Sequence, residues 1–334
     1  MGTVLTEQSL ELINALQIAP RVPWNRLSDI LGATPITLSQ RWSEIRARGQ
    51  AWVTAAASGA ARGSAIAFVE VDCGMDRMGD LGQIFVQTPE IVSVERLSQG
   101  ATFGLTVIED DLGDLATRSL DAITQHAGVV SVQVSACIAL HHGAHLWRLD
   151  HLDPGQMDAL RAINREMSAT DPTIALGPES PPIIRMLQRD GRCTAADVSR
   201  RLGLSPATVR RRLAAVLHSG AIFLRTEVAQ SHSGWPVNVQ WHARLLAGEH
   251  AAAAARLTAL NPRLVVSCTG GSNLVVTFWL RSLNDVLATE HAIEKAVPGI
   301  TLVQSRVLIR ALKRHGWVLR PDGTTTGAFV SVPQ

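Results

Sequence analysis

The sequence lacks several patterns on which metal, redox and nucleotide chemistry depend. Its four cysteines, Cys73, Cys137, Cys193 and Cys268, are far apart and form no C-x-x-C pair, which argues against a zinc ribbon or a redox dithiol. The glycine-rich stretch from Thr269 to Gly271 has neither G-x-G-x-x-G nor P-loop spacing, so it does not indicate nucleotide binding. We therefore expect reduced cysteines and neither a metal nor a cofactor.

Long apolar runs and a large net charge are absent too. No apolar run approaches the roughly 18 residues that a membrane span requires, and the first residues lack the basic region and apolar core of a signal peptide. The formal net charge is only +2, and 46% of the residues are hydrophobic against 18% charged. We expect a soluble, cytoplasmic protein without a membrane partner, and 334 residues suffice for at least two domains.

The positive charge that is present gathers in two segments. Residues 183–225 carry nine arginines against two aspartates, and residues 12–54 carry five arginines against two acidic residues. The rest of the chain is net negative. Because binding to a phosphate backbone requires such a local excess of cations, both segments are candidates for a nucleic-acid interface.

The second basic segment encodes a pair of short helices. Thr194 to Gly203 has the N-cap and the closing glycine of a short helix. Ser205 is a favourable N-cap for the next helix, Pro206 suits its first position and Gly220 suits the residue after its end. Its apolar side consists of Val209, Leu213, Val216 and Leu217. Two such helices at a tight turn, the second basic on its free side, are typical of a helix-turn-helix.

The chain repeats itself at an offset of 171 residues. This shift aligns Leu31-Gly32 with Leu202-Gly203, Pro35 with Pro206, Thr37 with Thr208, Arg41 with Arg212, Gly49 with Gly220, and Gly100 with Gly271. Self-similarity at one fixed offset indicates a repeated structural unit. The sequence therefore predicts two copies of one unit in tandem.

Each copy is predicted to hold a helix-turn-helix followed by a sheet module. Strands and amphipathic helices follow one another as βαββαβ, which folds into an antiparallel ferredoxin-like sheet with both helices on one face. The fold class is α+β. The predicted domains are helix-turn-helix 1 (1–54), sheet module 1 (65–141), a connector with a short helix at Pro154 to Met167 (142–178), helix-turn-helix 2 (179–229), sheet module 2 (234–313) and a loosely ordered tail (314–334).

Three segments of the second copy carry a family resemblance. These are Leu187-Gln-Arg-Asp-Gly-Arg192, Leu202-Gly-Leu-Ser-Pro-Ala-Thr-Val-Arg-Arg-Arg-Leu213 and Ser219-Gly-Ala-Ile222. Together with the βαββαβ order, they resemble the Lrp/AsnC (feast/famine) family of prokaryotic transcriptional regulators. The first copy matches more loosely, through Leu31 to Pro35 and Arg41. Typical members carry one unit per chain and dimerise through their sheets, so the resemblance implies a fused pseudo-dimer that forms homo-oligomers of two or more chains.

The resemblance implies that the third helix of each helix-turn-helix enters the major groove of double-stranded DNA. Arg211 is the best candidate for a contact to guanine, with Ser205 and Thr208 near the groove entry. Arg210 and Arg212 are placed for phosphate contact or for packing, and for Arg212 a structural salt bridge is an equal alternative. The corresponding residues of the first copy are Thr37, Gln40 and Arg41.

The two reading helices differ in charge. Where the second copy has Arg211 and Ala215, the first has Gln40 and Glu44, so its groove side has lost a cation and gained an anion. A carboxylate facing phosphate is repelled unless it accepts a hydrogen bond from cytosine. We therefore expect the second helix-turn-helix to dominate the affinity for DNA.

The resemblance also implies a small effector, an amino acid or another metabolite, near the turn between the second and third strands of each sheet. The family pattern T-G-x-x-D becomes Thr269-Gly270-Gly271-Ser272-Asn273 in copy two and Ser98-Gln99-Gly100-Ala101-Thr102 in copy one. Thr269, Gly270, Gly271, Asn273, Gly100 and Thr102 are thus the candidate effector residues. Neither copy keeps the carboxylate, and an equal alternative is that the glycines only permit a tight hairpin.

Other functions stay open at this stage. His141, His142 and His145 invite a metal or acid–base role, although a solvated loop accounts for them as well. Siroheme decarboxylases also use Lrp-like folds, but the absence of tyrosine and the basic reading helix count against such an enzyme. The sheets could also serve as an oligomerisation module without DNA binding, which the uneven charge argues against.

Overall fold

The computed structural model describes residues 5–57, 64–99, 101–171 and 173–331. The chain divides into two compact units. A helical unit comprises the described parts of Leu5–Arg62 and Arg148–Ala229, and a sheet unit comprises those of Gly63–Trp147 and Gln230–Pro333. None of the described helices is both long and apolar enough to cross a membrane. Each unit is described by itself below.

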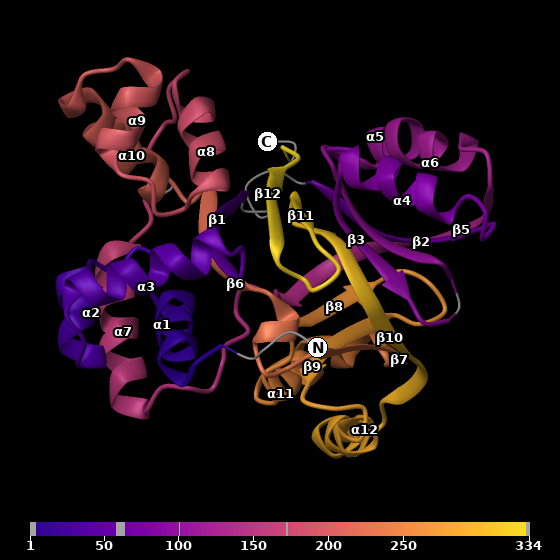
Figure 1. Cartoon of the computed structure of the whole chain (residues 1–334). Coiled ribbons are helices and arrows are strands. Elements are labelled where there is room, and N and C mark those ends of the chain that lie inside the picture. Colours follow the sequence, from indigo (N-terminus) through magenta and orange to yellow (C-terminus); the bar gives the residue numbers. More distant parts are fainter. Residues whose placement is uncertain (1–4, 58–63, 100, 172, 332–334) are drawn as a thin grey trace. The chain divides into compact units, whose positions relative to one another are not determined.

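The helical unit contains two three-helix bundles, a connecting helix and two short strands (Figure 1). The first bundle consists of α1 (Glu7–Ile18), α2 (Trp24–Leu31) and α3 (Pro35–Ala47), and the second of α8 (Ser180–Arg189), α9 (Ala195–Leu202) and α10 (Pro206–His218). The connecting helix is α7 (Pro154–Met167), and the strands are β1 (Ala51–Ala57) and β6 (Ile222–Val228). The two predicted helix-turn-helix domains thus belong to one compact unit, together with the connector helix.

Local sequence explains where these helices begin and end. Ser205 caps α10, because its side chain accepts a hydrogen bond from the backbone N–H of Thr208 at 3.2 Å. Gly203 ends α9 in the left-handed conformation, with φ of 67°. Asp153 caps α7 and forms a capping box with Gln156. The predicted bounds of the connector helix are confirmed.

Strands β1 and β6 pair antiparallel in a register that joins corresponding positions. Ala51 pairs with Val228, and Thr54 pairs with Arg225. Thr54 and Arg225 are themselves 171 residues apart, which is the offset of the sequence repeat. A strand that pairs with its own counterpart about a central residue has local two-fold symmetry. The axis of the helical unit therefore passes between Thr54 and Arg225.

Two arginines reinforce this symmetry by reaching into the opposite bundle. Arg21 and Arg192, also 171 residues apart, each donate two hydrogen bonds to backbone carbonyls in the other copy's turn. The acceptors are Gly191 (2.6 Å) and Cys193 (3.1 Å) for Arg21, and Pro20 (2.7 Å) and Val22 (2.9 Å) for Arg192. Burial, and next the repulsion by Arg21, lower the pKa of Arg192 to about 10. Arg192 thus stays charged at neutral pH, and both side chains join the two bundles.

The sheet unit is built on eight antiparallel strands that close into a ring. In ring order they are β10 (Thr301–Arg314), β3 (Ile91–Leu97), β4 (Phe103–Glu109), β2 (Ala65–Cys73), β5 (Val129–His142), β8 (Leu264–Cys268), β9 (Leu274–Leu280) and β7 (Val237–Arg244), and β7 pairs with β10 again. Each half keeps one strand order, β5-β2-β4-β3 and β10-β7-β9-β8. Each half therefore has the four antiparallel strands that the βαββαβ order predicts, but the two predicted sheet modules are joined in one closed ring.

The length of two strands explains why the modules merge. β5 and β10 have 14 residues each, about twice the length of most other strands of the ring. The first part of β5 pairs with β2 of its own half, and the part after Cys137 pairs with β8 of the other half. β10 likewise pairs with β7 up to Val307 and with β3 from Leu308. Backbone groups that would lie at the edges of two open sheets are paired in this way.

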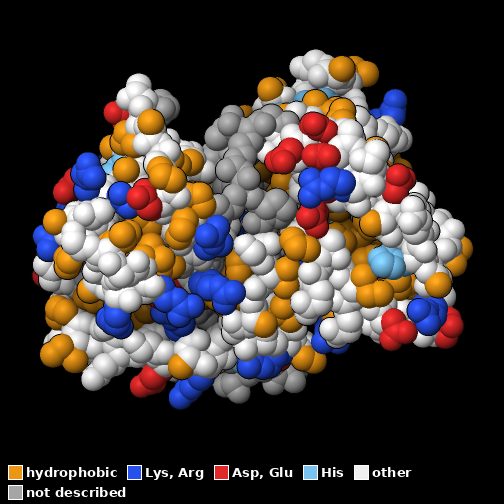
Figure 2. Space-filling model, turned by 90° about the horizontal axis from the view of Figure 1, so that it is seen from above, with side chains coloured by type: hydrophobic (Ala, Val, Ile, Leu, Met, Phe, Trp, Pro, Cys, Tyr) orange, Lys and Arg blue, Asp and Glu red, His pale blue; other side chains and the backbone are white. Residues whose placement is uncertain are grey.

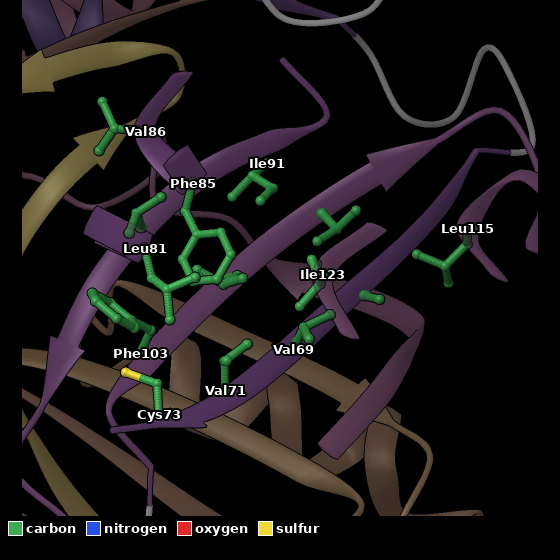
Figure 3. Close-up of a cluster of buried hydrophobic side chains, with 14 residues drawn as sticks. Val69, Val71, Cys73, Leu81, Phe85, Val86, Ile91, Phe103, Leu115 and Ile123 are labelled. Carbon is green, nitrogen blue, oxygen red and sulfur yellow. The ribbon is translucent and has the colours of Figure 1, made fainter. Parts of the chain in front are cut away.

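Helices cover the outer faces of both halves. The first half carries α4 (Met78–Gln87) and a helical stretch of α5 (Leu112–Asp114), the π-helical turn Leu115–Leu120 and α6 (Asp121–Gln125), and the second half carries α11 (His250–Thr258) and α12 (Asp285–Ala296). Figure 3 shows Phe85 of α4 above Phe103 of β4, among Val69 and Val71 of β2. The two phenyl rings meet edge to face at 5.5 Å. Alternating strand residues thus bury one side under the helices, as their spacing predicts.

The part of the tail that the structure describes, up to residue 331, forms regular structure, contrary to our expectation. Residues beyond β10 form β11 (Trp317–Leu319) and β12 (Thr325–Phe329), which extend the sheet outside the ring. Trp317 packs against Phe329 at 5.3 Å between ring centroids. The turn between the strands is held by Asp322, whose carboxylate accepts hydrogen bonds from Thr324. The threonine- and glycine-rich composition, which suggested disorder, instead supplies a hairpin turn.

We predict that Arg192→Gln lowers the free energy of unfolding by about 1–3 kcal/mol, because it removes charged hydrogen bonds to two carbonyls. Urea denaturation followed by circular dichroism measures this change. Arg200→Gln is the matched control, since Arg200 is an exposed arginine that pairs with Asp197 of its own helix, on the surface of the same bundle. Equal stability of the two variants would contradict the bridging role of Arg192.

Candidate nucleic-acid interface

Helix α10 presents opposite sides to the bundle core and to the surface. Val209, Leu213 and Val216 are buried in a cluster with residues of α8 and α9. The opposite side carries Arg210 and Arg211, which are both exposed. This is the arrangement in which the second helix of a helix-turn-helix offers its free side to a groove.

The three consecutive arginines of α10 are not equivalent. Arg212 pairs with Glu179 at 2.6 Å between Nη1 and Oε1, so it serves the fold of the second bundle. Arg210 and Arg211 make no side-chain hydrogen bond or ion pair with any residue that the structure describes. A guanidinium that is exposed and uncommitted is available to guanine or phosphate. Of the two alternatives left open for Arg212, the structure shows the salt bridge.

The predicted contacts at the start of α10 are partly used by the cap. The hydroxyls of Ser205 and Thr208 lie 2.9 Å apart, and Ser205 also accepts the Thr208 backbone N–H. Ser205 remains exposed. Each hydroxyl can form a further hydrogen bond. The role of both residues at the groove entry therefore stays a prediction.

Helix α3 repeats this geometry with different chemistry. Its cap, Thr34 with Thr37, matches that of α10. Arg41 is engaged, because its Nη2 donates to Oε1 of Gln8 at 2.7 Å. The exposed side holds Gln40 where α10 has Arg211 and Glu44 where α10 has Ala215, together with Ile36. Ile36 is 71% exposed, and the sequence analysis did not single it out.

The second arginine of α3, Arg46, also pairs with another residue of the chain. Nη1 of Arg46 lies 2.7 Å from Oδ2 of Asp190, which belongs to the second bundle. Figure 2 shows Lys and Arg side chains over the surface of the helical unit, at its left. At the predicted reading face α10 therefore carries two exposed arginines, whereas α3 carries Gln40 and Glu44.

The predicted effector turn of the second half is held by its own side chains. Asn273 binds the backbone of Leu245 twice, with Nδ2 donating to the carbonyl at 2.9 Å and Oδ1 accepting the N–H at 3.0 Å. Thr269 accepts the N–H of Ala136 at 2.9 Å, which ties β8 to β5. Gly270 has φ of 117°, a conformation that favours glycine. These contacts are structural, and an effector role for the turn stays a prediction.

The corresponding turn of the first half gives less information. Thr102 donates to Oδ1 of Asp72 at 2.8 Å and so also serves the fold. Gly100 lies outside the described residues. At both turns the polar side chains that the structure describes have partners within the protein, so binding of an effector there stays a prediction.

His141, one of the three histidines singled out in the sequence, lies near a further imidazole, that of His250. Nε2 of His141 and Nδ1 of His250 each lie 2.7 Å from the Ser267 hydroxyl. Burial, followed by the charge of His250, lowers the pKa of His141, which favours a neutral ring. Among the described residues no group of three or more His, Cys, Asp or Glu is placed to hold a metal ion.

A second polar group lies on the side of the ring that faces away from the helices. Glu70 of β2 pairs with Arg306 of β10 at 2.5 Å, and His242 of β7 lies 3.9 Å from Glu70. Burial and the nearby Arg306 lower the pKa of His242, against the opposite effect of Glu70. The three residues come from distant parts of the chain and meet only because the ring closes, so sequence reasoning missed them.

Comparison with known proteins gives a match to one domain family and a likeness to two kinds of solved structure. Residues 182–215 match the AsnC-type helix-turn-helix domain. No curated protein matches the chain.

Among solved structures, the siroheme decarboxylase NirDL in co-complex with an iron-uroporphyrin III analogue is similar over 92% of this chain and 93% of its own, with 12% identity and a TM-score of 0.57. A second crystal structure of the siroheme decarboxylase NirDL has a TM-score of 0.56 at 11% identity and 96% coverage of both chains. Transcriptional regulator NMB0573 from Neisseria meningitidis, in complex with L-Met, covers 41% of this chain and 91% of its own, with 20% identity and a TM-score of 0.37. At such identities the likeness to NirDL shows the fold alone.

We predict that Arg212→Ala and Arg211→Ala differ in stability. Loss of the Arg212 ion pair, which is about one third exposed, should lower the free energy of unfolding by about 0.5–1 kcal/mol. Arg211→Ala should leave it unchanged, because the side chain has no partner to lose. Thermal and urea denaturation of both variants measure the difference, and a larger loss for Arg211→Ala would overturn the assignment.

Proposed function

We propose that this protein is a sequence-specific DNA-binding transcriptional regulator and not an enzyme. The observation that carries the proposal is the exposed, uncommitted pair Arg210 and Arg211 on α10, inside the segment that matches an AsnC-type helix-turn-helix domain. The domain match supports DNA binding of this type. The arginines supply the chemistry for it, since arginine reads guanine through two parallel hydrogen bonds.

We propose further that the chain is a fused tandem of two Lrp/AsnC-type units. The two-fold arrangement at Thr54 and Arg225 relates α3 to α10, as the reading helices of a dimeric regulator are related. The expected DNA site is thus a near-palindrome. Because α3 lacks the uncommitted arginines of α10, the half-site under α10 should be specified more strongly, and further chains would assemble through the sheet units.

An effector belongs to this proposal as its finer part. An amino acid or related small metabolite would act at the sheet unit, near Thr269 to Asn273. Asn273 stands where the family has Asp and is bound to Leu245, so recognition of an ammonium group by this residue would require its side chain to turn.

The proposal is tested by selecting bound DNA from a randomised library and measuring affinities by fluorescence anisotropy. Arg211→Ala should weaken binding to the selected site about 5- to 150-fold, which corresponds to about 1–3 kcal/mol. Gln40→Ala, the matched change in the first copy, should weaken it less than about threefold. Equal losses for the two variants would refute the dominance of α10.

Salt dependence separates phosphate contact from base recognition. The logarithm of the affinity should fall linearly with the logarithm of the salt concentration, and Arg210→Ala should reduce the slope by about 1. A flat line for the natural protein would instead favour an oligomerisation module that does not bind DNA.

A second candidate is a siroheme decarboxylase-type enzyme. It is favoured by the likeness of the whole chain to NirDL and by the polar group of Glu70, Arg306 and His242 inside the ring. Titration with iron-uroporphyrin III, followed in the Soret region, distinguishes the two candidates. A saturable spectral change that Arg306→Gln abolishes would favour the enzyme, and no change is expected for the regulator.

A further inference from the structure

We propose that a pocket between α1 and α7 in the helical unit binds a small multivalent anion, such as phosphate or a di- or tricarboxylate. The pocket has a volume of about 230 Å³. It is lined by Ile18, Arg148, Met157, Arg161, Asn164 and Arg165. This site is separate from the DNA-reading side of α10, so the inference goes beyond the proposed function.

One wall of the pocket is a single face of α7. Met157, Arg161, Asn164 and Arg165 follow one another at spacings of three or four residues, or stand side by side, and therefore share a face. The helix that carries them is well fixed. Nε2 of Gln156 donates to the carbonyl of Ile30 at 3.1 Å, so the face is held against the first bundle.

The opposite wall comes from α1 and from the segment before α7. Ile18 is the last residue of α1. Arg148 is anchored through its neighbour Leu149, which is buried and whose N–H donates to Oε1 of Gln17 at 2.8 Å. Both walls are thus positioned before any ligand arrives, which limits the entropy that binding costs.

The lining has three arginines and no acidic residue. Asp158 pairs with Arg161 at 2.9 Å, but it does not line the pocket. Burial, and next the repulsion from Arg161 and Arg225, lower the pKa of Arg148 to about 10. An anion placed between these guanidiniums would relieve the repulsion and accept charge-assisted hydrogen bonds from more than one of them.

The size of the pocket restricts the ligand. Pockets for drug-sized ligands and cofactors measure about 300–1,000 Å³ and are mostly apolar. This pocket is smaller, and three of its six lining residues are arginines, beside Asn164 and the apolar Ile18 and Met157. A compact anion with several charged oxygens fits both properties, whereas a nucleotide or an aromatic metabolite fits neither.

An anion bound here would tighten the contact between α7 and the first bundle. That contact also includes the ion pair of Arg26 with Glu166 at 2.9 Å. The described chain after the second sheet half continues into β11 and β12, so α7 has no counterpart on the second bundle. The ligand would therefore stabilise the bundle that carries the weaker reading helix.

The test uses the full-length protein and isothermal titration with phosphate and with citrate at constant ionic strength. Arg161 and Arg165 are exposed, so the double variant Arg161→Gln/Arg165→Gln should fold. We expect saturable binding of at least one anion to the natural protein, and at least tenfold weaker binding to the double variant. Arg256→Gln, which removes an exposed arginine of α11, is the control and should bind as the natural protein does.

The two anions distinguish a phosphate ligand from a carboxylate ligand. A parallel melting experiment should show a larger rise in melting temperature for the natural protein than for the double variant at the same anion concentration. Equal rises would mean general stabilisation by the salt and would overturn the proposal. The proposal would also be overturned if neither anion bound saturably. It would be overturned too if DNA, and neither anion, protected the pocket.

Discussion

The pairing of β1 with β6 is the constraint on which the helical unit depends. Surface contact alone would not fix the orientation of two bundles that carry no opposite net charge. The strands meet at corresponding residues, with Thr54 opposite Arg225, and the side chain of Thr54 also donates to the carbonyl of Gln188 at 2.5 Å. Arg21 and Arg192 then lock the turns on either side. Sheet hydrogen bonds set the symmetry, and buried guanidiniums stabilise it.

In the sheet unit, the two halves are held together by pairing of their edge strands. Two open four-stranded sheets would each expose edges, and such edges invite pairing with other chains. Because β5 and β10 run through both halves, each edge is used inside the same molecule. As a consequence, polar side chains such as Glu70 and Arg306 face the inside of a closed ring. Because burial of an unpaired charge is costly, they pair with each other there.

The sequence predicted the features that a few neighbouring residues determine. It did not predict those that depend on how the strands close into a ring. Gly203, Ser205 and the Asp153 cap carry their structural meaning within a few residues, so the helices of the helix-turn-helix and the connector were predicted closely. The strands were predicted as well. Their partners were not, since the pattern of β5 shows that it is a strand and leaves open which neighbours pair with it.

The same distinction applies to the sites. The charge of α10 was evident from the sequence, but only the contact of Arg212 with Glu179 separates a structural arginine from its two uncommitted neighbours. The partners of His141, and the wall that Arg148 contributes to the anion pocket, lie far away in the chain. Nothing in the order of residues could have joined these groups before the fold was known.

If the chain is a fused tandem, as proposed above, the fusion removes a limit that symmetric dimers have. In a homodimer every substitution occurs twice, so both reading helices must stay equally good. Here α10 keeps Arg211 while α3 carries Gln40, and α7 with its arginine pocket serves the first bundle alone. A two-fold scaffold can then hold two different surfaces. The bundle whose α3 has Gln40 where α10 has Arg211 is also the bundle beside the proposed anion pocket, so its stability would respond to that ligand without altering α10.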